Sequence, residues 1–218
     1  MIRGRPRRRD ADASRTLDLC GLLLEYPHER THAGAGELRD AADGLPDGPT
    51  RDALRRFLAW WTAVPLDAIR RHYVETFDLK RRCGLYLTYY EEGDKRGRGM
   101  ALLRLRKLYR AAGLPMADDE LPDFLPVMLE FAASAPEGRG LTVLGQYRAE
   151  IELVRLALVD EGSPYAALLD AVTLVLGEPS AVDRARAATV AAQGPPQELV
   201  GLEPFGMPDV HGGAEARR

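Results

Sequence analysis

The hydrophobic positions of this chain recur at three- and four-residue steps over most of its length. Two sets show this most clearly: Leu54, Phe57, Leu58 and Trp61, and then Leu144, Tyr147, Ile151, Val154 and Leu158. Such spacing places the apolar side chains on one face of an α-helix. No run of β-branched residues alternates with polar ones as a strand would require. The sequence therefore predicts an all-α fold.

Capping residues and prolines divide this pattern into segments. Ser14 is placed to cap a first helix that ends near Tyr26, and Thr50 is placed to cap a second. Pro65 suits the first turn of a third helix that reaches Asp78. Further helical segments are expected over residues 100–112, 121–132, 144–158 and 163–176, with a short one after Ser180. We expect a single compact bundle of about eight helices.

The length supports one domain with flanking segments. A chain of 218 residues with 45% hydrophobic residues can bury a sizeable core. Residues 1–13 are expected to form a basic, flexible arm, residues 14–193 the all-helical domain, and residues 194–218 a mobile tail. The tail begins at Gly194-Pro195-Pro196, which ends the regular structure.

Charge and cysteine content narrow the class of protein. The formal net charge is −3, which does not favour a nucleic-acid partner. Cys20 and Cys83 lie outside any metal-binding spacing, so a reduced chain is the simpler interpretation. The apolar run at 17–24 contains Asp18, is shorter than the roughly 20 residues that a membrane span needs, and lacks a following cleavage site. We expect a cytoplasmic protein without export or stable membrane insertion.

One short motif suggests metal chemistry. His28-Glu29-Arg30-Thr31-His32 matches the HExxH pattern, in which two histidines of one helix hold zinc. Pro27 precedes it, glycines follow it and no third ligand is evident, so a loop is favoured over a metalloenzyme site. The chain has no GxSxG elbow and no phosphate-binding glycine loop. We expect no enzyme activity, no metal and no cofactor.

Two basic segments support an alternative function. Arginines crowd residues 3–9, and a second strip comprises Arg104, Arg106, Lys107 and Arg110. A helical regulatory or nucleic-acid-binding protein would use such segments, although solvated surfaces are the commoner outcome.

Aromatic and acidic residues are concentrated between residues 73 and 130. Side chains of these two kinds around a gap between helices would suit a basic, amphipathic peptide helix. Core packing and helix capping are the competing explanation for each residue taken singly. The predicted peptide-binding residues are Tyr73, Phe77, Asp78, Tyr86, Tyr89, Tyr90, Asp94, Glu120, Leu121, Asp123, Leu125 and Glu130.

Several motifs in these regions carry a family resemblance. They are Leu24-Glu25-Tyr26-Pro27, residues 73–78 (YVETFD), 85–90 (LYLTYY), 93–100 (GDKRGRGM), 119–123 (DELPD) and 129–131 (LEF). Over about residues 16–176 the chain resembles the nitrate reductase molybdenum cofactor assembly chaperones, the NarJ group of the TorD-like redox enzyme maturation proteins. It departs from them at Phe124, where the family commonly has histidine.

The resemblance implies a function without catalysis. It implies an all-helical chaperone that binds the amino-terminal segment of the catalytic (alpha) subunit of respiratory nitrate reductase. The chaperone would keep the apoenzyme competent for molybdenum cofactor insertion and would not stay in the finished complex. Molybdenum cofactor biosynthesis proteins are further implied partners. The HExxH segment falls where relatives are variable, which weakens the zinc interpretation.

Overall fold

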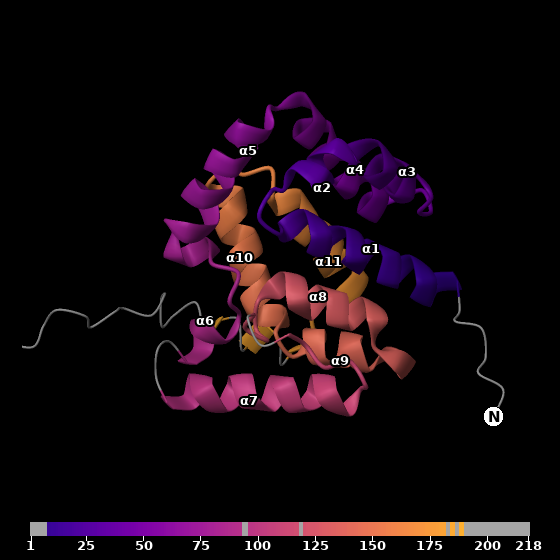
Figure 1. Cartoon of the computed structure of the whole chain (residues 1–218). Coiled ribbons are helices and arrows are strands. Elements are labelled where there is room, and N and C mark those ends of the chain that lie inside the picture. Colours follow the sequence, from indigo (N-terminus) through magenta and orange to yellow (C-terminus); the bar gives the residue numbers. More distant parts are fainter. Residues whose placement is uncertain (1–7, 93–95, 118–119, 182–183, 186–187, 190–218) are drawn as a thin grey trace, which may run out of the picture.

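A computed structural model of the chain (Figure 1) describes residues 8–92, 96–117, 120–181, 184–185 and 188–189. Within these residues the α-helices are α1 (Arg8–Leu24), α2 (Glu29–Ala33), α3 (Ala35–Asp43), α4 (Pro49–Ala63), α5 (Leu66–Tyr73), α6 (Thr88–Glu92), α7 (Arg96–Ala111), α8 (Leu125–Ser134), α9 (Arg139–Gly145), α10 (Arg148–Asp160) and α11 (Ala166–Leu176). A π-helical turn (Val74–Asp78) and two 3₁₀ turns (Arg81–Cys83 and Pro136–Gly138) accompany them. The prediction of an all-α fold is confirmed.

The helices are more numerous than predicted because one expected helix is divided and because short helices form in segments that were expected to be irregular. The stripe predicted over 144–158 is split between α9 and α10, since the chain turns at Gln146 and Tyr147. Residues 28–32, predicted as a loop, contain the five-residue helix α2. Helix α8 begins at Leu125, so Pro122 precedes the helix instead of lying in its first turns.

The first helix also differs from the prediction. It begins at Arg8, six residues before Ser14, so Ser14 lies inside the helix and does not cap it. Asp10 stands in the first turn, where a carboxylate favours helix formation. Part of the segment predicted as a flexible arm is therefore helical. Residues 1–7 and the predicted tail, 194–218, lie outside the described residues, and the three-region division stays a prediction.

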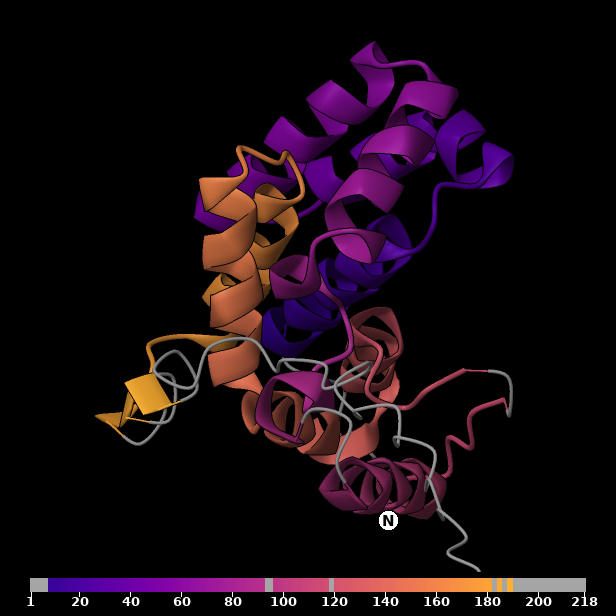
Figure 2. The ribbon, with the colours of Figure 1, turned by 90° about the vertical axis from the view of Figure 1, so that its left-hand side faces the viewer.

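Helix α1 crosses α8 at close range, and this contact organises the centre of the molecule (Figures 1 and 2). Gly21 makes the approach possible: a Cβ atom there would lie 3.3 Å from the Pro126 carbonyl oxygen and 3.5 Å from Cβ of Leu129. Helix α11 packs against both α1 and α4, and α10 runs beside α11. Helix α9 packs against α8. Figure 1 shows α7 along the lower edge of the molecule.

An aromatic cluster joins the upper helices. The Tyr165 ring lies 5.1 Å from that of Phe57 and 4.9 Å from that of Phe77, measured between centroids. Phe77 also lies 4.8 Å from Tyr73, and all four residues are buried. Phe77 belongs to the π-helical turn that continues α5, in which the Leu79 N–H donates to the Val74 carbonyl at 3.1 Å. The turn thus fixes where α5 ends relative to the core.

The segment before α6 is tied to the segment before α8. Tyr86 and Phe124 form an antiparallel β-bridge, and their rings lie 5.2 Å apart. The Leu87 N–H donates to the Asp123 carbonyl at 3.0 Å, and the Leu125 N–H donates to the Leu85 carbonyl at 2.8 Å. These bonds bring together two motifs that are more than thirty residues apart in sequence.

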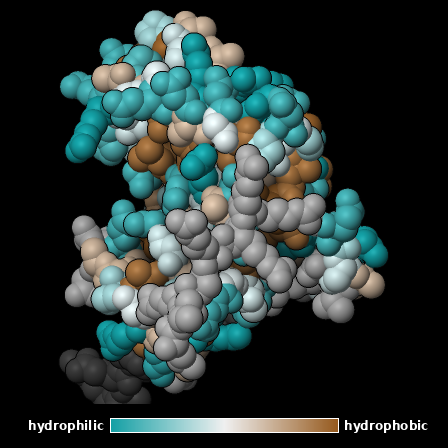
Figure 3. Space-filling model, turned by 90° about the vertical axis from the view of Figure 1, so that its right-hand side faces the viewer, coloured by the Kyte–Doolittle hydropathy of each residue, from teal (hydrophilic) through white to brown (hydrophobic). Residues whose placement is uncertain are grey.

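Polar side chains cover much of the surface. Figure 3, which views the molecule from the right-hand side of Figure 1, shows them across the upper part, where α3 and α4 lie. Apolar side chains gather in the middle of this face. Among the described helices, none is long and apolar enough to cross a membrane.

Candidate functional site

Five of the predicted site residues lie beneath the surface. Tyr73, Phe77, Tyr90 and Leu125 are buried, and the Asp123 side chain is fully buried. The Tyr73 hydroxyl donates to the Leu24 carbonyl at 3.0 Å. The Tyr90 hydroxyl lies 2.9 Å from two backbone carbonyls of the 82–84 segment. In this structure these residues support a surface and do not line it.

The exposed members of the predicted set lie above them. Tyr86 and Leu121 keep 42% and 39% of their surface exposed, although both are large hydrophobic residues. Asp78, Glu120 and Glu130 are exposed carboxylates, and the half-buried Tyr89 carries the Arg98 guanidinium 5.6 Å from its ring centroid. Asp94 lies outside the described residues.

Helix α1 adds residues that the sequence prediction missed. Asp18, Leu22 and Glu25 follow helical spacing, and all three are exposed. Tyr26 follows them with 41% of its surface exposed, and its ring lies edge-on to Tyr73 at 5.5 Å. We call the combined set the acidic–aromatic surface: Asp18, Leu22, Glu25, Tyr26, Asp78, Tyr86, Glu120, Leu121 and Glu130.

The carboxylates of this surface are close enough to repel one another. Burial raises the pKa of Glu25, and the carboxylates of Glu120 and Glu130 raise it further. Burial likewise raises the pKa of Asp18, with Glu130 adding to the effect. These three segments, distant in sequence, therefore place their negative charges in one region.

Tyr86 lies in the same negative field. Burial raises its pKa, and the carboxylates of Asp123, Asp78 and Glu120 raise it further. Exposed aromatic rings among mutually repelling carboxylates can bind an amphipathic cation, because a positive charge relieves the repulsion and an apolar face covers the rings.

Asp123 anchors this surface from below. Its carboxylate accepts a 2.6 Å hydrogen bond from the Thr88 hydroxyl and a 3.3 Å bond from the Thr88 N–H. The Arg98 guanidinium lies 3.7 Å from the same oxygen, and the Tyr109 hydroxyl donates to the neighbouring Pro122 carbonyl at 2.7 Å. These bonds hold the chain segment on which Leu121 is exposed.

The HExxH segment does not assemble a metal site. His28 precedes α2, with its ring 5.8 Å from that of Tyr26. The His32 Nε2 atom lies 3.4 Å from the Val64 carbonyl oxygen. In the part of the chain that the structure describes, no three His, Cys, Asp or Glu side chains are grouped to hold a metal ion.

The basic strip lies on α7. Met100 and Leu103 are exposed on this helix beside Arg104 and Lys107. The Arg104 guanidinium donates to the Gln146 side chain at 3.4 Å. The Arg106 guanidinium donates to the Glu120 carbonyl at 3.3 Å, which connects the strip to the loop of the acidic–aromatic surface.

The sequence contains a pattern that could have indicated the exposed residues in and just after α1. Leu22 and Tyr26 are separated by four positions, and acidic residues stand on both sides of Leu22 at helical spacing. The core stripe of the same helix, which includes Leu17, Leu23 and Leu24, gave the stronger pattern and concealed this second face.

Comparison with solved structures identifies the class of fold. The chain is similar to a protein of Archaeoglobus fulgidus that is described as a candidate redox enzyme maturation protein. The TM-score is 0.56 at 24% sequence identity, and the alignment covers 82% of this chain and 99% of the other. The two chains therefore share one all-helical fold.

Sequence comparison identifies the family. Residues 43–170 match the family model "Nitrate reductase delta subunit", and the chain belongs to that family. The chain is 32% identical over 165 residues to the probable nitrate reductase molybdenum cofactor assembly chaperone NarJ of Bacillus subtilis, covering 76% of this chain and 90% of that protein. It is 34% identical over 157 residues to the chaperone NarJ of Escherichia coli, covering 71% of this chain and 66% of that one.

A further relative is considerably longer. The chain is 41% identical over 152 residues to the nitrate reductase-like protein NarX of Mycobacterium tuberculosis. That match covers 69% of this chain and 22% of NarX. The chain thus corresponds to about one fifth of that protein.

Proposed function

We propose that this chain is a cytoplasmic assembly chaperone for nitrate reductase. It binds the amino-terminal segment of the catalytic (alpha) subunit and keeps the apoenzyme competent for molybdenum cofactor insertion and complex assembly. It acts by binding, without catalysis, and it meets the molybdenum cofactor biosynthesis proteins at the same apoenzyme. Membership of the family and the names of the relatives support this proposal.

The acidic–aromatic surface is the proposed peptide-binding site. The observation that carries this assignment is that the carboxylates of Glu120 and Glu130 lie close enough to Glu25 to repel it, beside exposed Tyr26 and Tyr86. Like charges held close together cost free energy in the unbound chain, so a basic peptide that binds beside them relieves that cost. The apolar side of an amphipathic helix would cover Leu22, Tyr26, Tyr86 and Leu121.

The buried part of the predicted set has a different proposed role. Asp123, Tyr73 and Tyr90 hold backbone segments in place through their hydrogen bonds. They act on peptide binding through the position of Tyr86 and Leu121. A test by substitution of Asp123 would therefore mix folding with binding, and exposed residues make the sharper test.

Calorimetric titration tests the proposal. The ligand is a synthetic peptide of the amino terminus of the catalytic nitrate reductase subunit from the same organism. The test variant is Glu25→Gln with Glu120→Gln, and the matched control is Glu37→Gln with Asp40→Asn, two exposed carboxylates of α3. The test variant should bind about fivefold to tenfold more weakly, and the control should bind like the unmodified chain.

Two results would count against the proposal. No binding of the peptide by the unmodified chain would overturn the chaperone function. Equal binding by both variants would leave a chaperone whose binding site lies elsewhere. A salt-dependent gel shift with duplex DNA would instead favour a nucleic-acid-binding protein that uses the basic strip of α7.

A further inference from the structure

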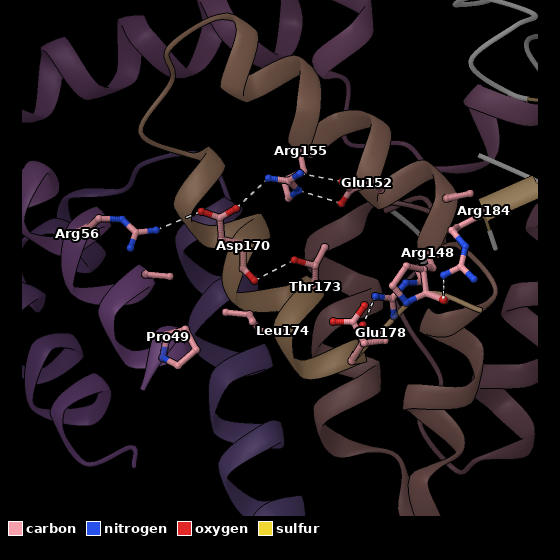
Figure 4. Close-up of a pocket in the computed structure, with 14 residues that line it drawn as sticks. Pro49, Arg56, Arg148, Glu152, Arg155, Asp170, Thr173, Leu174, Glu178 and Arg184 are labelled. Carbon is pink, nitrogen blue, oxygen red and sulfur yellow. Dashed lines mark hydrogen bonds and ion pairs between the residues drawn. The ribbon is translucent and has the colours of Figure 1, made fainter. Parts of the chain in front are cut away.

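A concave site lies away from the acidic–aromatic surface and shares no residue with it. It is a hollow of about 740 Å³ between the first halves of α4 and α10, the second half of α11, residues 177–179 and Arg184 (Figure 4). Its volume falls in the range of small-molecule sites, which is about 300–1,000 Å³. Four arginines and three carboxylates line it: Arg56, Arg148, Arg155, Arg184, Glu152, Asp170 and Glu178.

Two of the arginines are already neutralised by carboxylates. Arg155 binds Glu152 at 2.7 Å and Asp170 at 3.1 Å, and its hydrogen bond to Glu152 is the main cause of its raised pKa. Arg56 binds the second oxygen of Asp170 at 3.1 Å. Figure 4 shows this connected row on one side of the hollow. The two positive and two negative charges of this row cancel, so the row offers a ligand no net charge.

The other two arginines have no carboxylate partner among the described residues. The Arg148 guanidinium donates to the Gly177 carbonyl, and the Arg184 guanidinium donates to the Pro179 carbonyl at 2.6 Å. Figure 4 places Arg148 and Arg184 together at the opposite side of the hollow from Arg56. Arg148 is buried, with 9% of its surface exposed, and a buried charge without a counter-ion is costly.

The capping role of Arg148 leaves most of its donors unused. Its bond to Gly177 satisfies a carbonyl just beyond the end of α11, as basic side chains commonly do. A guanidinium has five N–H donors in a planar fork that matches an oxyanion. Glu178 also lines the hollow near Arg148, so the lining as a whole is positive by one charge.

Apart from Thr173, the rest of the lining carries no polar side chain. Ala53, Ala149 and Leu174 contribute to the hollow, and a smaller hollow of about 280 Å³ shares Arg148 and Glu178 with it. A ligand would therefore meet both a positive end and an apolar wall. A small molecule with phosphoryl groups at one end and a flat organic ring at the other has the matching distribution of negative charge and apolar surface.

We propose that this hollow binds a phosphorylated small molecule of nucleotide size, with its phosphoryl oxygens on Arg148 and Arg184. Its organic portion lies against Ala53 and Leu174 on α4 and α11. Binding supplies a counter-charge to these two arginines, which form no ion pair with a carboxylate among the described residues. The site is independent of the peptide site, which uses other residues.

Calorimetric titration with ATP, without added magnesium, tests the proposal, and adenosine is the probe that lacks phosphoryl groups. Arg184→Ala is the main variant because Arg184 is exposed and its loss should not disturb folding. Arg110→Ala, an exposed arginine of α7, is the matched control. ATP should bind the unmodified chain and the control equally, and bind Arg184→Ala about tenfold more weakly. Adenosine should not bind measurably.

A second variant extends the test to the buried arginine. Arg148→Gln should also weaken ATP binding at least tenfold, and urea unfolding establishes that the variant is folded. Three results would overturn the proposal: no ATP binding at millimolar concentration, adenosine binding as tight as ATP, or equal weakening by Arg110→Ala. Binding of the reductase peptide should be unchanged in Arg184→Ala, so this test and that of the chaperone function fail separately.

Discussion

The hydroxyl of Thr88 donates a 2.6 Å hydrogen bond to the carboxylate of Asp123, and both side chains are buried. The bond joins the start of α6 to the segment before α8. A second oxygen of the same carboxylate has no protein hydrogen-bond partner among the described residues. The pair therefore couples two family motifs through one charged group in the interior.

Replacing Asp123 should destabilise the fold. Asp123→Ala removes the acceptor of the Thr88 bonds and the charge opposite Arg98, so the free energy of unfolding should fall by about 3 kcal/mol. Thr88→Val removes one bond and should cost about 1 kcal/mol. Urea unfolding of both variants and of the double variant measures this. Additive losses in the double variant would contradict a direct coupling of the two residues.

Two glycines of α9 should differ in how much stability is lost when each is replaced by alanine. A Cβ atom at Gly140 would lie 2.4 Å from Cα of Ala132 and 2.7 Å from the Phe131 carbonyl oxygen, so Gly140→Ala should cost about 3 kcal/mol. Gly145→Ala is the control, since nothing lies within 4 Å of a Cβ atom there. Its effect on the unfolding free energy should lie within about 1 kcal/mol. Thermal or urea unfolding checks both, and equal losses would refute the close packing of α9 on α8.

Substitution of two leucines of similar exposure tests whether peptide binding is confined to the acidic–aromatic surface. Leu121→Ala should weaken binding of the reductase peptide about fivefold, because the side chain would be covered in the complex. Leu156→Ala, at 45% exposure on α10, should leave binding unchanged. Calorimetry with the same peptide measures both. A loss of affinity in Leu156→Ala alone would move the site to α10.

The effect of Glu130→Gln on the free energy of unfolding should depend on pH. At neutral pH Glu130→Gln removes repulsion with Asp18 and Glu25, so it should raise the free energy of unfolding by about 0.5 kcal/mol. Because the pKa values of both neighbours are raised, both carboxylates are protonated at a higher pH than unperturbed carboxyl groups as the pH falls. The gain should therefore shrink as the pH falls from neutral toward the carboxyl titration range.

Urea unfolding of both chains at several pH values measures this difference. His72, whose pKa is lowered by burial, favours the unfolded chain at acidic pH, but it does so equally in both chains and cancels. A gain that is independent of pH would exclude repulsion as its cause. The same variant should bind the peptide more weakly at neutral pH, since it loses an attractive charge.

Several helices were predictable because their core stripe is continuous. Leu54, Phe57, Leu58 and Trp61 are buried on α4, as their spacing indicated. The division between α9 and α10 was not predictable in this way. Tyr147 and Ile151 continue the apolar period across the turn, so the pattern alone gives no sign that the helix is interrupted.

The candidate site was only partly predictable because it depends on contacts between segments that are distant in sequence. Glu120 and Asp123 were both predicted to face a peptide, yet Asp123 is buried while Glu120 is exposed. The position of Asp123 depends on its pairing with the segment around Thr88, 35 residues away, and a local pattern does not encode such a contact. Glu25 and Tyr26 joined the site only through the crossing of α1 over α8.

The π-helical turn at Val74–Asp78 sets the rotational phase of the residues that follow α5. It contains one more residue per turn than the α-helix that precedes it. A chain with one residue deleted here could close an ordinary α-helical turn, and the later side chains would then rotate by roughly 100° about the helix axis. Phe77 would leave the Tyr165 ring, and Asp78 would leave the neighbourhood of Tyr86. A single inserted residue thus places one side chain of the turn in the core and the next on the peptide-binding surface.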